Sequence, residues 1–263
     1  MYQLTEDEIN QARIWNAYAD RGYLQSTIDP RDRKGLKCDY INHWSKYYAK
    51  KFVLDGKGGM NVLEIGCGSG RNLFGLAPYI GHGYGIDVAA KQIENAEAMR
   101  RHLKIENVSF FVNPDAFFER NFAVQTVFTM WVLQGFANDE NLCKMLATYC
   151  ERIPTARRFI FFEQIARSQY MVNEDGGFYK KIRTKSDYTS ILSRVGLEVT
   201  DFRILNEKGF GPFYRFVYKG SMYKYWPMWL NLNKVLFALD RHLVHRKVAN
   251  TFTDSVFVCA RTR

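Results

Sequence analysis

The chain has 263 residues, of which 47% are hydrophobic and 24% are charged. This composition excludes general disorder, and the length suits one α/β domain with embellishments. No stretch of about 18 apolar residues occurs, and the acidic N-terminus has no hydrophobic signal segment, so neither a membrane span nor a leader is predicted. The formal net charge of +10 would favour an anionic partner such as nucleic acid, a membrane surface or an acidic substrate.

The five cysteines are odd in number, scattered along the chain and outside any C-x-x-C spacing. We therefore expect reduced thiols in a cytoplasmic protein, and neither a disulfide framework nor a zinc site. Carboxylates and histidines do not cluster at metal-ligand spacing, so we predict no metal.

Two helices are predicted before the first buried strand. Thr5 and Glu8 have the spacing of a capping box, which predicts a helix over about 6–19. An aromatic-rich helix is predicted over 38–54, after a polar linker. Because residues 1–58 precede the core, we expect them to form a helical cover that folds over the functional site.

From residue 61 onward, predicted strands and helices alternate, which indicates a mostly parallel sheet with helices on both faces. The apolar runs predict strands over 61–65, 83–87, 108–112, 124–130, 158–162, 197–204 and 255–260. The intervening segments predict a helix that begins near Arg71 and helices over 89–103, 138–152 and 187–195, the last with Ser186 as its N-cap.

A long insertion, 206–252, precedes the last predicted strand. It interleaves lysine and arginine with aromatic side chains, namely Phe210, Phe213, Tyr214, Phe216, Tyr218, Tyr223, Tyr225, Trp226 and Trp229. A helix is predicted after Pro227, and the basic run His245-Arg246-Lys247 follows it. Three roles are open: a lid over the substrate site, a surface that lies on an anionic membrane, or an apolar face buried in a dimer or against the core.

The most specific motif is the run Val62-Leu63-Glu64-Ile65-Gly66-Cys67-Gly68-Ser69-Gly70-Arg71-Asn72. A buried strand leads through three glycines into a helix, so that backbone amides can approach an electron-rich ligand. Asp87 closes the next strand, where a carboxylate can bind a ribose diol. Arg71 stands where a dinucleotide fingerprint requires glycine, and the Gly-Lys-Ser/Thr ending of a P-loop is missing. The pattern therefore predicts a nucleoside-cofactor site of another kind.

The run resembles motif I of the class I S-adenosylmethionine-dependent methyltransferases, and the spacing of elements over 60–263 is similar to that family. The resemblance implies a Rossmann-like seven-stranded sheet whose last strand is antiparallel, between strands five and six, in a cofactor-binding domain over 59–263. S-Adenosylmethionine is the implied cofactor. The residues that the resemblance places against it are Glu64, Gly66, Cys67, Gly68, Gly70, Asp87, Val88, Gln92, Asp115, Ala116, Met130 and Trp131.

The same resemblance implies a role for each part of this set. The glycine turn would wrap the methionine part of the cofactor, and Asp87 would bind the ribose hydroxyls. Gln92 would pack near the adenosine, and Asp115 with Ala116 would recognise the adenine amine. Met130 and Trp131 would line the methionine or methyl region.

The segment after Met130 lacks the Asn/Asp-Pro-Pro-aromatic motif of many base-directed methyltransferases, so a nucleic-acid substrate is not expected. The chain looks similar to the small-molecule branch, although Gly135 stands where its members often carry histidine. For a hydroxyl acceptor, the candidate general bases are Glu163 at the end of a strand and His43 on the second helix, and each is also open to a structural role.

The Trp15 to Ala19 segment (Trp-x-x-Tyr-Ala) and the basic aromatic tail are loosely similar to methyltransferases of bacterial surface-glycan pathways. We therefore predict a cytoplasmic O-methyltransferase of polysaccharide biosynthesis, acting on a sugar or glycan intermediate that could be anionic. A natural-product or quinone-type methyltransferase and a non-catalytic cofactor-binding scaffold are the alternatives. Peripheral association with an anionic membrane and a homo-oligomeric state are left open.

Overall fold

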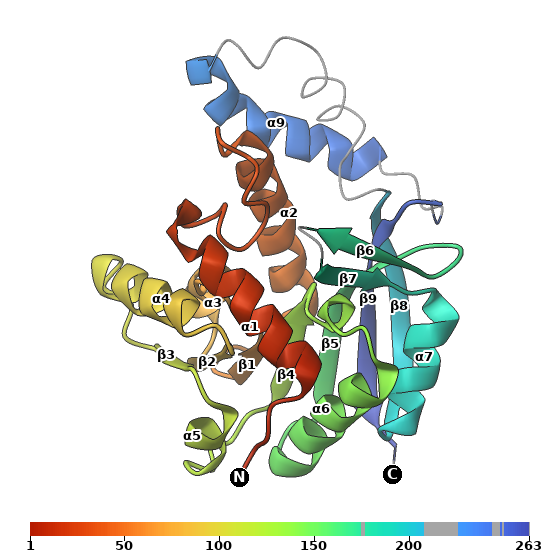
Figure 1. The fold of residues 1–263 in the computed structure, drawn as a ribbon. Coiled ribbons are helices and arrows are strands. Elements are labelled where there is room, and N and C mark those ends of the chain that lie inside the picture. Colours follow the sequence, from red (N-terminus) through yellow and green to blue (C-terminus); the bar gives the residue numbers. More distant parts are fainter. Residues whose placement is uncertain (175–176, 208–225, 244–247, 249, 263) are drawn as a thin grey trace.

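The computed structural model describes residues 1–174, 177–207, 226–243, 248 and 250–262. Its centre is a seven-stranded sheet of order β3-β2-β1-β4-β5-β9-β8, and the hairpin β6-β7 forms a second sheet (Figure 1). The strands are β1 Asn61–Ile65, β2 His82–Ile86, β3 Val108–Phe111, β4 Thr126–Met130, β5 Arg158–Ile165, β6 Tyr170–Glu174, β7 Gly177–Ile182, β8 Leu197–Glu207 and β9 Thr253–Arg261.

The direction of the last strand agrees with the predicted topology. β1 to β5 pair in parallel, whereas β9 is antiparallel to both β5 and β8. The predicted Rossmann-like sheet with an antiparallel last strand is therefore confirmed. Because the carboxyl ends of parallel strands gather at one edge, the turns after β1, β2 and β4 meet there.

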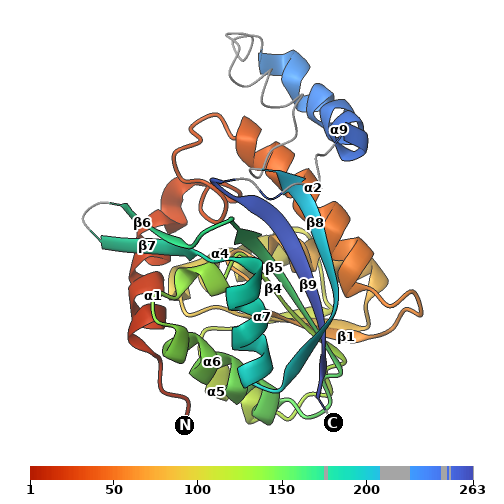
Figure 2. The same ribbon diagram turned by 90° about the vertical axis from the view of Figure 1, so that its right-hand side faces the viewer.

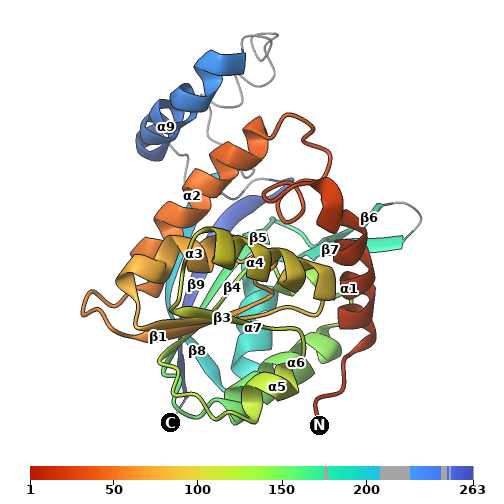
Figure 3. The same cartoon turned by 90° about the vertical axis from the view of Figure 1, so that its left-hand side faces the viewer.

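Helices cover both faces of this sheet. They are α1 Glu6–Tyr18, α2 Leu36–Val53, α3 Arg71–Leu76, α4 Ala90–His102, α5 Pro114–Phe118, α6 Asp139–Arg152, α7 Lys185–Arg194 and α9 Trp226–Leu243, with single turns η1 Ala19–Arg21, η2 Ala77–Tyr79 and η3 Leu133–Gly135. Helices α2 to α4 lie on one face and α5 to α7 on the other (Figures 2 and 3). Leu63 and Ile65 of β1 enter the apolar cluster under α5 to α7, and Val62 enters the cluster on the opposite face. This alternation explains why β1 is apolar throughout.

Local capping decides where two of the helices begin. Thr5 and Glu8 make both hydrogen bonds of the predicted capping box at α1, which is confirmed. The predicted N-cap of α7, Ser186, is wrong. Thr184 caps that helix, because Asp187 stands three residues later and completes a second capping box.

The hairpin β6-β7 and the short helix α5 are not among the predicted elements. The hairpin is half-exposed and carries polar residues such as Asn173 and Lys181, so no apolar run marks it. It lies against α1, where the side-chain amides of Asn10 and Gln11 each donate a hydrogen bond of 3.1 Å to a main-chain oxygen of β7. This contact ties the N-terminal helix α1 to the hairpin.

The helix predicted after Pro227 is confirmed as α9, which begins at Trp226 and packs on α2. The rest of the predicted insertion lies largely outside the described residues, including 208–225, with most of its aromatic side chains, and the His245-Arg246-Lys247 run. Among the helices that the structure describes, none is long and apolar enough to cross a bilayer.

Candidate functional site

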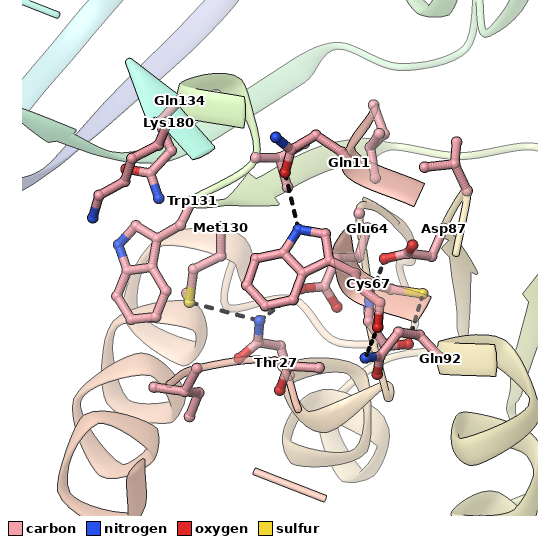
Figure 4. A pocket seen from close by; sticks show the side chains of 18 of the residues that line it. Gln11, Thr27, Glu64, Cys67, Asp87, Gln92, Met130, Trp131, Gln134 and Lys180 are labelled. Atoms are coloured by element: carbon pink, nitrogen blue, oxygen red, sulfur yellow. Dashed lines mark hydrogen bonds between the residues drawn. The ribbon is translucent and has the colours of Figure 1, made fainter. Parts of the chain in front are cut away.

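A cavity of about 370 Å³ lies at the carboxyl-terminal edge of the sheet and has the size of a small-molecule site. The turns after β1, β2 and β4 line it from the core, and α1, the following loop and the start of α2 line it from the N-terminal side. Figure 4 shows two ends, which we name by their residues. The glycine-turn end comprises Glu64, Gly66, Gly68, Asp87 and Gln92, and the Trp131 end comprises Trp131, Gln134, Gln164, Lys180 and Asp254.

The β1-α3 turn requires its glycines for two reasons. Gly66 and Gly68 have φ of +68° and +53°, in the left-handed region that side chains disfavour. A Cβ at position 68 would lie 2.6 Å from Thr27 Cγ2, and one at position 66 would collide with Val132. The turn is therefore pressed between the N-terminal loop and the segment after β4, with its backbone exposed to the cavity.

Asp87 is held in place by main-chain amides at the end of β2. Gly68 N–H donates to one carboxylate oxygen at 2.7 Å, and Ala89 N–H donates to the other at 2.8 Å. Burial raises the pKa of Asp87, and these two hydrogen bonds oppose that rise. The carboxylate is thus fixed at the cavity wall before any ligand arrives.

Glu64 is a fully buried acid with an unsatisfied oxygen. Asn72 Nδ2 donates to its Oε1 at 2.6 Å, whereas Oε2 has no hydrogen-bond partner. Burial raises the pKa of Glu64 to about 8, although Asn72 and the nearby Arg71 both lower it. A buried acceptor without a partner is costly unless a ligand supplies the donor. An ammonium group, such as that of the methionine part of S-adenosylmethionine, fits this position.

Arg71 adds a buried cation beside Glu64. Its guanidinium donates to Asn72 Oδ1 at 3.0 Å and lies 5.6 Å from the ring centroid of Trp131. Only 4% of the residue is exposed, and it lines the cavity between the two ends. A carboxylate is the group that would pair best with it. Arg71 and Glu64 together therefore fit the zwitterionic head of an amino acid.

Gln92 connects the N-terminal segment to the core. Its Nε2 donates to the main-chain oxygens of Trp15 and Ser26 at 3.1 and 3.2 Å. Ser69 Oγ of the glycine turn also donates to the Tyr23 carbonyl at 3.0 Å. Hydrogen bonds thus hold the part of residues 1–58 that includes Trp15, Tyr23 and Ser26 against the glycine-turn end.

The Trp131 end is polar and begins with a strained residue. Trp131 has φ of +61°, which is uncommon for a bulky side chain and occurs mostly where function or packing enforces it. Lys180 Nζ donates to Gln164 Oε1 at 3.0 Å, and Gln164 Nε2 donates to Asp254 Oδ1 at 3.3 Å. Burial raises the pKa of Asp254 to about 7, while Gln164, Lys180 and Trp131 act in the opposite direction.

Most of the predicted cofactor residues meet at this cavity. Those that line it are Glu64, Gly66, Cys67, Gly68, Asp87, Val88, Gln92, Met130 and Trp131. Gly70 does not line it, and acts as the N-cap residue of α3 with φ of +80°. The structure therefore brings together residues that are far apart in the chain, although their contacts with the cofactor stay predictions.

Asp115 and Ala116 are not among the residues that line the cavity. Both lie on α5, and the Asp115 carboxylate accepts the Tyr2 main-chain N–H at 2.7 Å through each oxygen. The structure gives Asp115 a role in anchoring the N-terminus. Their predicted contact with adenine stays a prediction that this arrangement does not favour.

Glu163 is also absent from the cavity wall. Its oxygens accept main-chain N–H groups of Val132 at 3.0 Å, Leu133 at 2.8 Å and Gln134 at 3.3 Å. Burial raises its pKa to about 7, and these hydrogen bonds counteract the rise. Glu163 therefore shapes the turn that carries Trp131, and the geometry favours its structural role over the predicted role as a base.

His43 is not among the residues that line the cavity. It lies on α2 with its Nε2 at 3.8 Å from Asp39, and its ring centroid is 6.5 Å from that of Phe237 on α9. Burial lowers the pKa of His43, and Asp39 raises it. The packing of His43 between two helices favours its structural role.

Sequence reasoning missed three residues of the site. Arg71 directly follows the third glycine, and that position at the functional edge of the sheet could have identified it. Lys180 lies on the unpredicted hairpin, and Asp254 comes just before the predicted last strand. Only the pairing of Gln164 with Asp254 across β5 and β9 places that acid at the site.

Comparisons with known proteins support this reading of the fold. Residues 56–189 match the family described as "Methyltransferase domain". Magnesium protoporphyrin IX methyltransferase from Synechocystis PCC 6803, with bound SAH, is similar over 98% of this chain and 100% of its own, at 16% identity and a TM-score of 0.61. Geranyl diphosphate C-methyltransferase from Streptomyces coelicolor A3(2) is similar over 99% and 100%, at 15% identity and a TM-score of 0.60. Among curated proteins, none matches the chain.

Proposed function

Because the chain belongs to the methyltransferase domain family and uses S-adenosylmethionine, we propose that it methylates a hydroxyl of a small polar acceptor, a sugar or glycan intermediate. The bound cofactor supplies a methyl group activated on a sulfonium. The observation that carries the proposal is a buried acid, Asp254, at the Trp131 end of the cavity that also holds the glycine turn. Residues 1–58 serve as the cover in this proposal.

The chain's main task is to hold the methyl donor and the acceptor in line. Glu64 Oε2, which has no partner, would accept a hydrogen bond from the amino group of the cofactor, and Arg71 would pair with the cofactor's carboxylate. Asp87 would bind the ribose hydroxyls. These three residues fix the donor, and Trp15 and Gln92 help to exclude water above it.

Asp254 accepts the proton that the acceptor hydroxyl loses as its oxygen is methylated. Its pKa of about 7 suits this role, because the carboxylate is populated near neutral pH and is basic enough to take a proton. Gln164 holds the carboxylate through a hydrogen bond, and Lys180 in turn holds Gln164. Asp254 is thus a general base that is held in place on the acceptor side of the site.

The lining of the Trp131 end supports a sugar over a flat apolar acceptor. Aromatic rings of Trp131, Tyr179 and Phe252 can cover the faces of a sugar ring, while Gln134 and Lys180 can bond its hydroxyls. The two structural neighbours described above are named for a porphyrin and an isoprenoid diphosphate. A natural-product or quinone acceptor is the second candidate.

Incubation with methyl-labelled S-adenosylmethionine tests this function. The protein is mixed with separated extracts that contain nucleotide sugars, lipid-linked glycans, quinones or RNA, and label is counted after cofactor removal. We expect label in a sugar-containing fraction, in a product that resists mild base because it is an ether. Label only in the quinone fraction would favour the second candidate, and cofactor binding without labelling of any fraction would favour a scaffold.

A further inference from the structure

Helix α9 presents two faces of different character. Asn233, Leu236 and Asp240 form a face that is buried against α2, where at most 5% of each residue is exposed. Asn233 Nδ2 donates to Asp39 Oδ2 at 3.0 Å, and the Tyr40 hydroxyl donates to the Asp240 carboxylate. These bonds fix the rotation of α9 about its own axis, and therefore decide what its other side presents.

The outer side carries an apolar stripe. Val235, Leu239 and Leu243 recur every four residues, which places them on one side of the helix, and they are 52%, 44% and 48% exposed. His242 borders this stripe, whereas Lys234 and Arg241 lie about 100° or more further around the helix, and the Arg241 guanidinium lies 5.3 Å from the ring centroid of Tyr47 on α2. α9 is also the outermost helix of the molecule in all three views, so the stripe lies at its periphery (Figures 1 to 3).

The stretch of sequence that includes α9 carries most of the chain's excess positive charge. Between residues 208 and 249 it has one acidic residue, Asp240, and eight basic ones, namely Lys208, Arg215, Lys219, Lys224, Lys234, Arg241, Arg246 and Lys247. This segment alone accounts for +7 of a formal net charge of +10. An apolar stripe within so basic a segment complements a surface that has anionic groups outside and an apolar layer beneath them.

We infer that α9 docks the protein on an anionic lipid bilayer, with the stripe of Val235, Leu239 and Leu243 inserted at the level of the headgroups. The stripe contributes apolar burial, and the basic side chains contribute attraction to anionic lipids. This inference does not rest on the proposed function.

Docking through α9 also has a consequence for the site. Helix α2 carries α9 on one side through Tyr40 and Trp44, while its residues Lys37 and Ile41 line the cavity. Both α2 and α9, each about 10–12 Å wide, therefore lie between the docking face and this wall of the cavity. An acceptor attached to a lipid would have to reach on the order of 20 Å from the headgroups to the site.

Vesicle co-sedimentation of the full chain tests the inference. The probes are phosphatidylcholine vesicles with and without about 30% phosphatidylglycerol. We expect binding to the anionic vesicles at about 0.05 M NaCl and loss of most of it at about 0.5 M NaCl. The Val235→Asp/Leu239→Asp variant should lower the partition coefficient about tenfold or more, because it removes apolar burial and adds negative charge.

The matched control is Ile9→Asp/Met171→Asp, which makes the same kind of change at residues that are 57% and 56% exposed outside α9. It should bind like the original chain, and circular dichroism should show both variants folded. Equal binding of both double variants would overturn the inference, as would binding that ignores phosphatidylglycerol. A lipid-free dimer that only the α9 variant dissociates, without vesicle binding, would assign the stripe to a second copy of the chain.

Discussion

The two ends of the cavity draw on different parts of the chain. The glycine-turn end takes Glu64, Gly68 and Asp87 from a single β-α-β unit, whose spacing alone brings them together. The Trp131 end takes Trp131 from the turn after β4, Lys180 from the hairpin and Asp254 from β9. The residues proposed to bind the donor are therefore brought together by local backbone geometry, whereas those proposed to bind the acceptor depend on how distant strands are paired.

Each end contains a buried acid with a raised pKa, but the surroundings differ. Glu64 has a pKa of about 8, and its Oε2 has no hydrogen-bond partner. A cationic group of a ligand could supply that partner. Asp254 has a pKa of about 7, and Gln164 already holds one of its oxygens. In the proposed function, the first acid binds a positive group and the second accepts a proton near neutral pH. This contrast can be tested one end at a time.

The largest effect is expected at the Trp131 end. Asp254→Asn keeps the shape of the side chain but removes the proton acceptor, so methyl transfer should slow by about 100-fold or more. The affinity for S-adenosylhomocysteine, measured by calorimetry, should change by less than about threefold, because the glycine-turn end is untouched. The control Asp201→Asn makes the same change at a surface acid on β8 and should keep full activity.

The role of Asp254 as the base also predicts the direction in which the rate of methyl transfer changes with pH. Asp254 is protonated below a pKa of about 7, so the base form is lost and the rate should fall about tenfold per pH unit on the acid side. Asp254→Asn should flatten this limb. If methyl transfer in the variant keeps both its rate and its pH profile, Asp254 is not the base, even where the original chain methylates a sugar.

A smaller effect is expected at the glycine-turn end. Glu64→Gln keeps an oxygen for Asn72 but removes the charge that holds an amino group, so S-adenosylhomocysteine should bind about 10- to 100-fold more weakly. Glu97→Gln on α4, where the acid pairs with Arg100 on the surface, is the matched control.

Proton linkage separates this explanation from a loss of packing. At pH 7, Glu64 with a pKa of about 8 is mostly protonated, and binding of a cationic group favours its charged form. Binding should therefore release up to about one proton, and the affinity should rise as pH approaches 8. Calorimetry in buffers of different ionisation enthalpy measures this release. Equal release by the original chain and by Glu64→Gln would contradict the assignment.

The smallest effect concerns the cover. Gln92→Ala leaves the main-chain oxygens of Trp15 and Ser26 without their donor, which should lower the free energy of unfolding by about 1–2 kcal/mol. Thermal unfolding should show a decrease of about 2–8 °C. The exposed Gln3→Ala change should leave the melting temperature unaltered. A Gln92→Ala protein as stable as the original would mean that the cover is held by other contacts.

Short-range patterns in the sequence were sufficient for the core and for one end of the site. The capping box at Thr5 and Glu8, the apolar run of β1 and the glycine turn each concern neighbouring residues, and each is found as predicted. The antiparallel last strand came from the resemblance to the family, because no local pattern indicates where β9 pairs. The missed hairpin β6-β7 has no apolar run, since α1 and the cavity take up only part of its surface.

The predicted bases show where local reasoning ends. Glu163 lies near the end of β5 at the correct edge of the sheet, but the three amides after β4 surround its carboxylate. Asp254 lies on the paired strand β9, opposite Gln164, and lines the cavity. Whether Glu163 or Asp254 reaches the cavity depends on which side chains of β5 and β9 face it. The pairing of these strands decides that.

The sequence by itself determined the family, the cofactor and the glycine-turn end, because these depend on residue types at fixed spacing within one β-α-β unit. Only the tertiary structure decided the Trp131 end, the fastening of the cover by Gln92 and the exposed stripe of α9. Each of these depends on contacts between segments that are distant in the chain. The glycine turn takes its shape from residues within one β-α-β unit, whereas Asp254 reaches the site because β9 lies between β5 and β8.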